Sequence, residues 1–208
     1  RKEVFLTGAP TNDILANHEE AFRKEIRIKL GIKENKKAIL YAPTFREYRQ
    51  VGTFDMPEVD FKKWHNLLGE EFVILYRAHP ISGTTSMAGE EWFIDVTDRD
   101  DIEPLMIASD ILISDYSGLI TDYSIMHKPI YLWTYDYKQY ENSRGLYFDV
   151  REVLPYAEKE ETLLSMIKGG YTEEQKQLLL SFQQKYATVY GSATLNAVNV
   201  IYDKIAKR

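Results

Sequence analysis

Short apolar segments that are rich in β-branched residues alternate along this chain with segments of helical periodicity. The apolar segments recur at intervals of roughly 30 residues, which is the spacing of βαβ units, in which a helix connects two parallel strands. This alternation predicts an α/β fold with a parallel sheet flanked by helices. The expected strands cover residues 4–6, 37–42, 72–76, 92–96, 111–113 and 129–133.

The segments between and after these strands show the apolar spacing and the terminal signals of helices. Candidate caps at residues 11–13 precede a helix over 14–30. His127 and Lys128 suit the negative end of a helix that stops near residue 126. We expect one domain over residues 1–208, in which the segments from about residue 158 are helical and serve packing. The remaining helices are expected at 61–68, 102–107, 119–126, 161–167, 172–190 and 192–207.

The composition of the chain argues against several kinds of site and partner. The chain contains no cysteine, which excludes disulfides, thiolate chemistry and cysteine-based zinc sites. Its net charge of −6 argues against a nucleic-acid partner, because nucleic-acid modules carry clustered Lys and Arg. Residues 1–37 hold nine Lys or Arg against six Asp or Glu; the excess favours a solvated helix surface, with a contact to anionic lipid as the alternative. No apolar run approaches the ~20 residues that span a bilayer.

The most informative turn is the one over residues 114–118, which reads Ser-Asp-Tyr-Ser-Gly. It follows the apolar strand 111–113 and precedes helical spacing, so Ser117 is a candidate N-cap. The backbone N–H groups at a helix start attract anions, and Gly118 would let a phosphate approach the backbone closely. The turn is therefore a candidate phosphate site, and the alternative is a serine that only caps the helix.

Polar side chains follow the other strands in the same way. Thr44 and Arg46 follow one strand, and Arg77 and His79 follow the next. Because open parallel sheets bind ligands at the carboxyl ends of their strands, these residues are expected to converge with the turn over 114–118 on a phosphorylated or nucleotide ligand. His79 could bind phosphate or move a proton. A surface arginine and a loop histidine without a role are the alternatives.

Two aspartates after the strand 92–96 admit two interpretations. Asp98 and Asp100 have the spacing of a carboxylate pair that holds a divalent metal ion. A helix begins directly after them, however, and helices favour acidic residues in their first turn. We therefore prefer the capping interpretation. The chain has neither a Walker-type phosphate loop nor a G-x-G-x-x-G motif, so ATP hydrolysis and dinucleotide redox chemistry have little support.

The same residues resemble the motifs of a known family, the CDP-glycerol glycerophosphotransferases that build teichoic acids. The resemblance covers about residues 7 to 150, and the order and spacing of its short motifs make it specific. The matching segments are 8–13, 41–46, 77–80, 114–117 with Asp122 and Tyr123, 128–130, and 140–147 with Arg144 and Gly145.

The resemblance implies a GT-B fold, of which this chain would be the C-terminal, Rossmann-like half that binds the donor nucleotide. Such enzymes transfer glycerol phosphate from CDP-glycerol to a lipid-linked polyol-phosphate acceptor and release CMP, with no metal ion and no other cofactor. The resemblance further implies a cytoplasmic enzyme at the inner face of the cell membrane, with a possible peripheral contact. The N-terminal acceptor domain, with a second histidine as general base, would be absent from these residues, so the chain alone is expected to bind donor and to turn over weakly or not at all.

By the same resemblance, His79 would be catalytic, because it would stabilise the donor pyrophosphate and the departing CMP. The turn after the strand 111–113 and the helix start would hold phosphate oxygens, and Thr97 and Asp98 would lie near the cytosine. Three arginines would provide further anion contacts. The expected substrate-binding residues are Arg46, Arg77, Thr97, Asp98, Ser114, Asp115, Tyr116, Ser117, Gly118, Asp122 and Arg144.

The chain departs from the family pattern at two positions. Gly118 stands where a second serine is usual, and Thr11 stands where an arginine is common.

Two other functions stay open. One is a GT-B transferase that uses CDP-ribitol or a nucleotide sugar, and the other is a non-catalytic nucleotide-binding module, for which His79 would be dispensable. An α/β domain that binds phosphate for an unrelated function is the remaining alternative.

Overall fold

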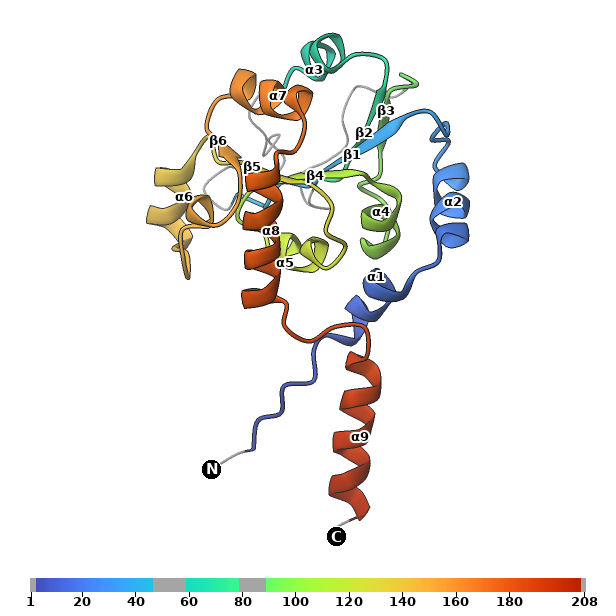
Figure 1. The fold of residues 1–208 in the computed structure, drawn as a ribbon. Helices are drawn as coiled ribbons and strands as arrows, with labels where there is room; N and C mark the ends of the chain where they lie inside the picture. The colour runs from blue at the N-terminus through green and yellow to red at the C-terminus, as the bar shows by residue number, and fades with distance from the viewer. Residues whose placement is uncertain (1–2, 47–58, 79–88, 207–208) are drawn as a thin grey trace.

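The computed structural model describes residues 3–46, 59–78 and 89–206. Its centre is a parallel sheet of six strands in the order β3-β2-β1-β4-β5-β6 (Figure 1). The predicted parallel α/β architecture is therefore confirmed. The strands are β1 (Lys37–Tyr41), β2 (Phe72–Tyr76), β3 (Phe93–Asp95), β4 (Ile111–Ser114), β5 (Ile130–Trp133) and β6 (Tyr156–Ala157).

Helices cover both faces of this sheet because side chains that alternate along each strand feed two separate cores. In β1, Ala38 and Leu40 pack on one side, while Ile39 and Tyr41 pack on the other. The first side is covered by α1 (Asp13–Asn17), α2 (Glu20–Lys29), α4 (Glu103–Ala108), α5 (Leu119–Ser124) and α8 (Glu173–Tyr186). The second is covered by α3 (Phe61–Leu68) and α7 (Glu160–Gly169), as Figure 1 shows.

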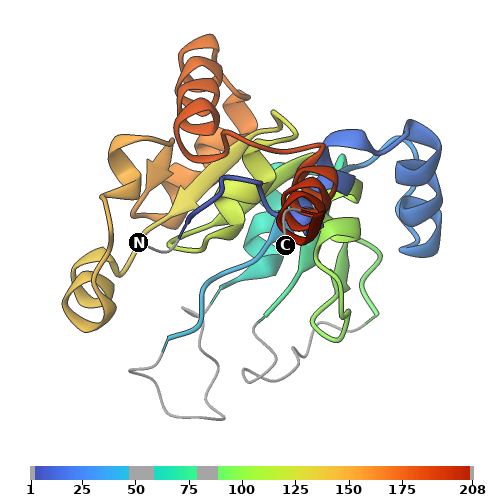
Figure 2. The same ribbon diagram turned by 90° about the horizontal axis from the view of Figure 1, so that it is seen from below.

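The last helix, α9 (Ala193–Ala206), points away from the body beside the N-terminal segment (Figures 1 and 2). It is anchored by residues 8–13, one of the segments that the sequence analysis singled out. The Asp13 carboxylate accepts hydrogen bonds of 2.8 Å from the backbone N–H groups of Ala193 and Thr194. Gly8 has a φ of +82°, and a Cβ there would lie 2.5 Å from the carbonyl oxygen of Val189. This segment therefore holds the C-terminal helix.

Several boundaries differ from the prediction. Residues 4–6 form no strand; Val4 and Leu6 are 93% and 77% exposed, because this apolar run has no neighbouring strand to pair with. The helix expected over 14–30 is interrupted at His18, whose backbone is extended and whose ring contacts the Leu15 carbonyl oxygen at 3.0 Å. The prediction missed β6, α6 (Tyr137–Arg144) and the 3-10 turns η1 (Pro10–Asn12) and η2 (Val150–Glu152). No helix among the described residues is long and apolar enough to cross a membrane.

Candidate functional site

The carboxyl edge of the sheet contains the point where the chain reverses its direction of travel across the sheet. From β1 the chain continues to β2 and β3 on one side, while β4, β5 and β6 lie on the other. In open α/β sheets, ligands bind outside the carboxyl ends of the strands at such a switch point. Here the switch lies between β1 and β4, which are paired at Tyr41 and Ile113. The segments that follow these two strands are 42–46 and 115–118.

A pocket of about 650 Å³ lies at this switch point. Its walls come from the segment after β1, from the turn before α5, and from α6 with the residues that follow it. Four residues that the sequence predicted as ligand contacts are brought together here: Tyr116, Ser117, Gly118 and Arg144. The remaining lining residues are Thr44, Tyr140, Gly145, Leu146 and Tyr147.

In the turn before α5, Ser117 bonds the start of the helix and Gly118 adjoins empty space. The Ser117 hydroxyl accepts a hydrogen bond from the Leu119 backbone N–H at 3.2 Å. The predicted N-cap is nevertheless wrong by one residue, because Gly118 is the N-cap residue of α5 and no side chain caps this helix. Gly118 has a φ of −58°, and a Cβ built there would meet no atom within 4 Å. Backbone conformation therefore does not require this glycine, and its effect is to leave the floor of the pocket open.

Ser114 and Asp115 are buried beneath the turn instead of facing the pocket. The Ser114 hydroxyl donates to the Ala42 carbonyl oxygen at 2.7 Å. The Asp115 carboxylate accepts from the backbone N–H of Thr44 at 2.9 Å, from the Thr44 hydroxyl at 2.5 Å and from the Tyr116 N–H at 2.7 Å. Both side chains therefore join the segments that follow β1 and β4.

Arg46 lies in the same buried layer, with 1% of its side chain exposed. Its guanidinium is 2.7 Å from Asp115 and 2.7 Å from Asp136, and Tyr116 donates to Asp136 at 3.0 Å. Burial opposes the charge, but the two carboxylates outweigh it and raise the pKa of Arg46 above its ordinary value. We call Arg46, Asp115, Asp136 and Tyr116 the carboxyl-edge cluster. The sequence analysis expected Arg46 to contact an anionic ligand, whereas the structure engages it with two carboxylates.

Arg77 and Thr97 join the ends of β2 and β3. The Thr97 hydroxyl accepts from the Ala78 backbone N–H at 3.1 Å, and Arg77 Nη2 donates to the Asp100 carbonyl oxygen at 3.2 Å. Arg77 Nη1 is buried without a hydrogen-bond partner among the described residues, and burial lowers the pKa of this guanidinium. Neither residue lines the 650 Å³ pocket. His79, the predicted catalytic residue, lies outside the described residues.

Asp98 and Asp122 also lie away from this pocket. Asp122 accepts a hydrogen bond of 2.6 Å from the Asn12 amide, and burial raises the pKa of its carboxyl group. Asp98 lines a different pocket with Asp100, between α2 and α4. Capping was the wrong interpretation of these two aspartates, because α4 starts at Glu103 with Ile102 as N-cap and no side-chain cap.

Within 3–46, 59–78 and 89–206, no three His, Asp or Glu side chains form a group that could hold a metal ion.

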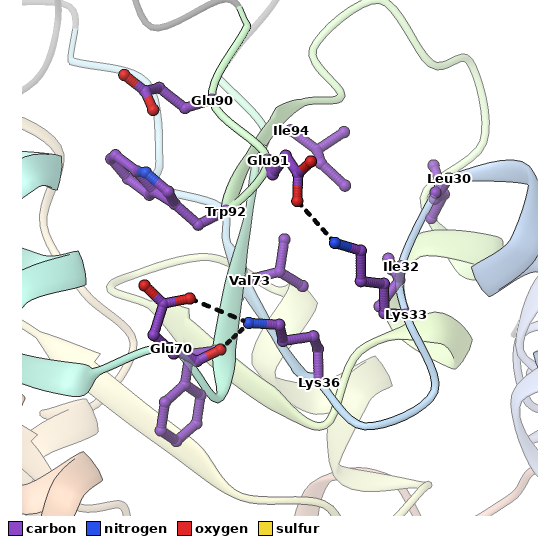
Figure 3. A pocket seen from close by; sticks show the side chains of 12 residues that line it. Leu30, Ile32, Lys33, Lys36, Glu70, Val73, Glu90, Glu91, Trp92 and Ile94 are labelled. Carbon is purple, nitrogen blue, oxygen red and sulfur yellow. Dashed lines mark hydrogen bonds and ion pairs between the residues drawn. The ribbon is translucent and has the colours of Figure 1, made fainter.

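A third pocket, of about 370 Å³, lies at the opposite, amino edge of the sheet (Figure 3). Its two lysines already have acidic or carbonyl partners: Lys33 lies 2.7 Å from Glu91, and Lys36 donates to the Glu70 carbonyl oxygen. This pocket is remote from the switch point between β1 and β4, and its lysines are neutralised. It is therefore the weaker candidate for an anionic ligand.

The sequence analysis assigned no role to Asp136 and did not select Tyr140 or Tyr147 as ligand contacts. The Tyr140 ring stacks on Tyr116 with a centroid distance of 4.0 Å, and Tyr147 is fully exposed at the pocket. One signal was available: Asp136 follows a predicted strand, as Arg46 and Asp98 do. The tyrosines gave no comparable signal, because the chain has 15 of them spread along its length.

Comparisons with known proteins identify the family of the chain. The family model described as CDP-glycerol:poly(glycerophosphate) glycerophosphotransferase matches residues 1–205. The chain is 37% identical over 163 residues to a teichoic acid poly(glycerol phosphate) polymerase of Staphylococcus epidermidis, with 74% of this chain and 22% of that protein covered. It is 32% identical over 162 residues to the teichoic acid ribitol-phosphate polymerase TarK of Staphylococcus aureus, with 74% and 31% covered.

A solved structure gives the same result at the level of the fold. A variant of the wall teichoic acid polymerase TagF superposes with a TM-score of 0.86 at 29% identity, which covers 98% of this chain and 52% of that one. The same TagF variant was also solved after a soak with CDPG. The chain thus spans about half or less of the length of these relatives.

Proposed function

The chain belongs to the CDP-glycerol:poly(glycerophosphate) glycerophosphotransferase family, and we propose that its carboxyl-edge pocket binds the cytidine donor from which glycerol phosphate is transferred to a teichoic acid acceptor, with release of CMP. The fold is of the GT-B type, as the family resemblance implied. Under this proposal the chain is the C-terminal, donor-binding domain of a longer transferase.

One observation carries the proposal: Ser117, Gly118 and Arg144 line one pocket at the topological switch point. Phosphoryl transfer depends mostly on positioning the phosphates and neutralising their charge. An exposed arginine opposite an open glycine turn meets both needs, because guanidinium groups bind phosphate oxygens with two parallel hydrogen bonds. Arg46, Ser114 and Asp115 support the turn from below instead of contacting the donor.

The other predicted residues keep proposed roles. We assign His79 to stabilising the pyrophosphate and the departing CMP, and Arg77 to a further anion contact. Thr97 and Asp98 would border the cytosine. Asp122 would contribute to substrate binding from α5, where its carboxylate accepts a hydrogen bond from the Asn12 amide. The acceptor would be a lipid-linked polyol phosphate bound by an N-terminal domain, and the reaction would take place at the inner face of the membrane.

A second candidate is the same reaction with CDP-ribitol as donor. The relative TarK, a ribitol-phosphate polymerase, favours this candidate, because it is 32% identical to the chain over 162 residues. The polyol is the only difference between the two donors, so both would use the same phosphate and cytidine contacts.

Calorimetric titration tests the proposal. The chain is titrated with CDP-glycerol, CDP-ribitol, CMP and UDP-glucose, and cytidine compounds are expected to bind more tightly than UDP-glucose. Arg144→Gln should weaken CDP-glycerol binding about tenfold or more, since it removes a charge-assisted phosphate contact. Lys33→Gln, which removes a cation at the amino edge, is the matched control and should leave the affinity unchanged. Equal binding of uridine and cytidine compounds would contradict the proposal.

A transfer assay on the longer protein then tests His79. His79→Ala should lower kcat by about 10²- to 10³-fold, the effect of removing one donor to a developing negative charge. Unchanged turnover in this variant would favour the non-catalytic role of the histidine that the sequence analysis left open.

A further inference from the structure

Asp136, to which the sequence analysis assigned no role, contacts residues of two other segments that surround the pocket. It lies just past β5 and is the N-cap residue of α6, and 7% of its side chain is exposed. Its carboxylate accepts hydrogen bonds from Arg46 Nε at 2.7 Å, from Arg46 Nη2 at 3.2 Å and from the Tyr116 hydroxyl at 3.0 Å. Arg46 thus binds Asp136 through two of its nitrogens, which is the strongest geometry for such a pair.

These contacts join segments that follow three neighbouring strands. Arg46 follows β1, Tyr116 follows β4 and Asp136 follows β5, and the sheet places these strands side by side. Segments after strands are usually the mobile part of an α/β domain. Buried, charge-assisted hydrogen bonds between them therefore fix the relative positions of the pocket walls.

The aromatic walls depend on the same contacts. The rings of Tyr116 and Tyr140 stack at 4.0 Å with an angle of 24° between their planes, and each ring lies 5.1 Å from the Arg46 guanidinium. Burial and then Asp136 raise the pKa of the Tyr116 hydroxyl, so it stays protonated and donates to Asp136. Tyr140 belongs to α6, which also carries Arg144. Asp136 therefore contacts Tyr116 through its side chain and directly precedes the helix that carries Tyr140 and Arg144.

Charge excludes a direct role of this cluster in binding phosphate. It contains two carboxylates and one guanidinium, which lies 2.7 Å from each of them, so one negative charge is in surplus. A surplus of buried negative charge repels an anion. We therefore propose that Asp136 is a positioning residue for the donor: through Arg46 and Tyr116 it aligns the glycine turn with the α6 wall that carries Arg144. This inference rests on the proposed function.

The test compares Asp136→Asn with a matched control at the other edge of the sheet. Asp110 also bridges two arginines, with Asp110 oxygens 2.5 Å from Arg23 and 3.2 Å from Arg27. Both variants are titrated with CDP-glycerol and CMP at a temperature well below their measured melting points. Asp136→Asn should weaken CDP-glycerol binding about tenfold or more, because misplaced contacts lose affinity steeply. Asp110→Asn should lower the melting temperature but leave the affinity unchanged.

Tyr116→Phe is a milder second variant in case Asp136→Asn does not fold. It removes only the hydroxyl that donates to Asp136, and we expect an affinity loss of about threefold to tenfold. If the unmodified chain binds no cytidine compound, the proposed function fails. If it binds and both variants bind equally well, the positioning role of Asp136 is wrong. A loss of affinity in Asp110→Asn that matches Asp136→Asn would also overturn it, since stability alone would then explain both.

Discussion

Each edge of the sheet carries a cluster of charged side chains in which one sign is in excess, and the sign in excess differs between the two edges. At the amino edge, Arg23 and Arg27 pair with one carboxylate, Asp110, and Lys128 lies close enough to interact with it electrostatically. We call these four residues the amino-edge cluster. At the carboxyl edge, one arginine lies between two carboxylates. The surplus cations at the amino edge donate to backbone carbonyl oxygens, and the surplus carboxylate at the carboxyl edge accepts from backbone N–H groups.

The carbonyl groups belong to the end of α4. Arg23 donates to Ile107 at 3.1 Å, Arg27 to Ala108 at 2.8 Å, and Lys128 to Ile107 at 2.9 Å and Ser109 at 2.7 Å. The last carbonyls of a helix have no partner inside it and carry partial negative charge, so cations stabilise them. The amino-edge cluster thus holds a helix, whereas the carboxyl-edge cluster holds loops around a pocket. The two differ in what their loss should do.

The largest expected effect is that of Arg46→Met. It leaves Asp115 and Asp136 buried without their cation, and breaking a buried ion pair in this way lowers the free energy of unfolding by about 3–5 kcal/mol. Urea denaturation measures the loss. If Arg27→Met were equally or more destabilising, the expected difference between the two edges would be contradicted.

Arg27→Met should have a smaller effect, about 1–3 kcal/mol, because Asp110 keeps Arg23 as a partner at 2.5 Å. The loss reflects the carbonyl groups of Ala108 and Lys36, which would be left without this donor. Donor affinity, measured by calorimetry on the folded variant, should stay unchanged. A weakened affinity would show that the amino edge also shapes the pocket.

Lys128 gives the amino edge a distinctive pH dependence. Burial and then the nearby Arg23 lower the pKa of Lys128 to about 8; Arg27 acts in the same direction, and Asp110 and Glu20 oppose it. Between this value and the ordinary 10.5, the unfolded chain binds more protons than the folded chain, so stability rises with pH. From pH 8 to 9.5 we expect a gain of about 1.5 kcal/mol relative to Lys128→Met.

The measurement is urea denaturation of both proteins at several pH values. Burial raises the pKa of Tyr131 to about 12, and because Tyr131 is present in both proteins its contribution cancels in the comparison. Parallel stability profiles for the two proteins would contradict the assignment of the slope to Lys128.

The smallest effect on stability is expected for Gly118→Ala. Its φ of −58° suits alanine, and the added Cβ would meet no atom within 4 Å, so the free energy of unfolding should change by less than about 0.5 kcal/mol. CDP-glycerol affinity should nevertheless fall several-fold, because the methyl group would occupy the open floor of the pocket. An unchanged affinity would place the phosphate elsewhere.

The sequence by itself determined the alternation of strands and helices. The runs at 37–41 and 72–76 are apolar throughout their buried part, and burial on both faces of a parallel sheet requires such runs. The same rule failed at residues 4–6, because an apolar run becomes a strand only where a neighbour supplies its hydrogen bonds. The start of the helix after Ser117 was also predicted to within one residue, since cap and glycine signals are local.

Only the tertiary structure decided which of the predicted polar residues line the pocket. Arg46 and Arg144 are indistinguishable as arginines in the sequence, yet one is buried between Asp115 and Asp136 and the other lines the pocket. Their difference depends on Asp136, which lies 90 residues from Arg46 along the chain. A local pattern specifies whether a residue follows a strand, but burial and pairing arise from strands that meet only when the sheet forms.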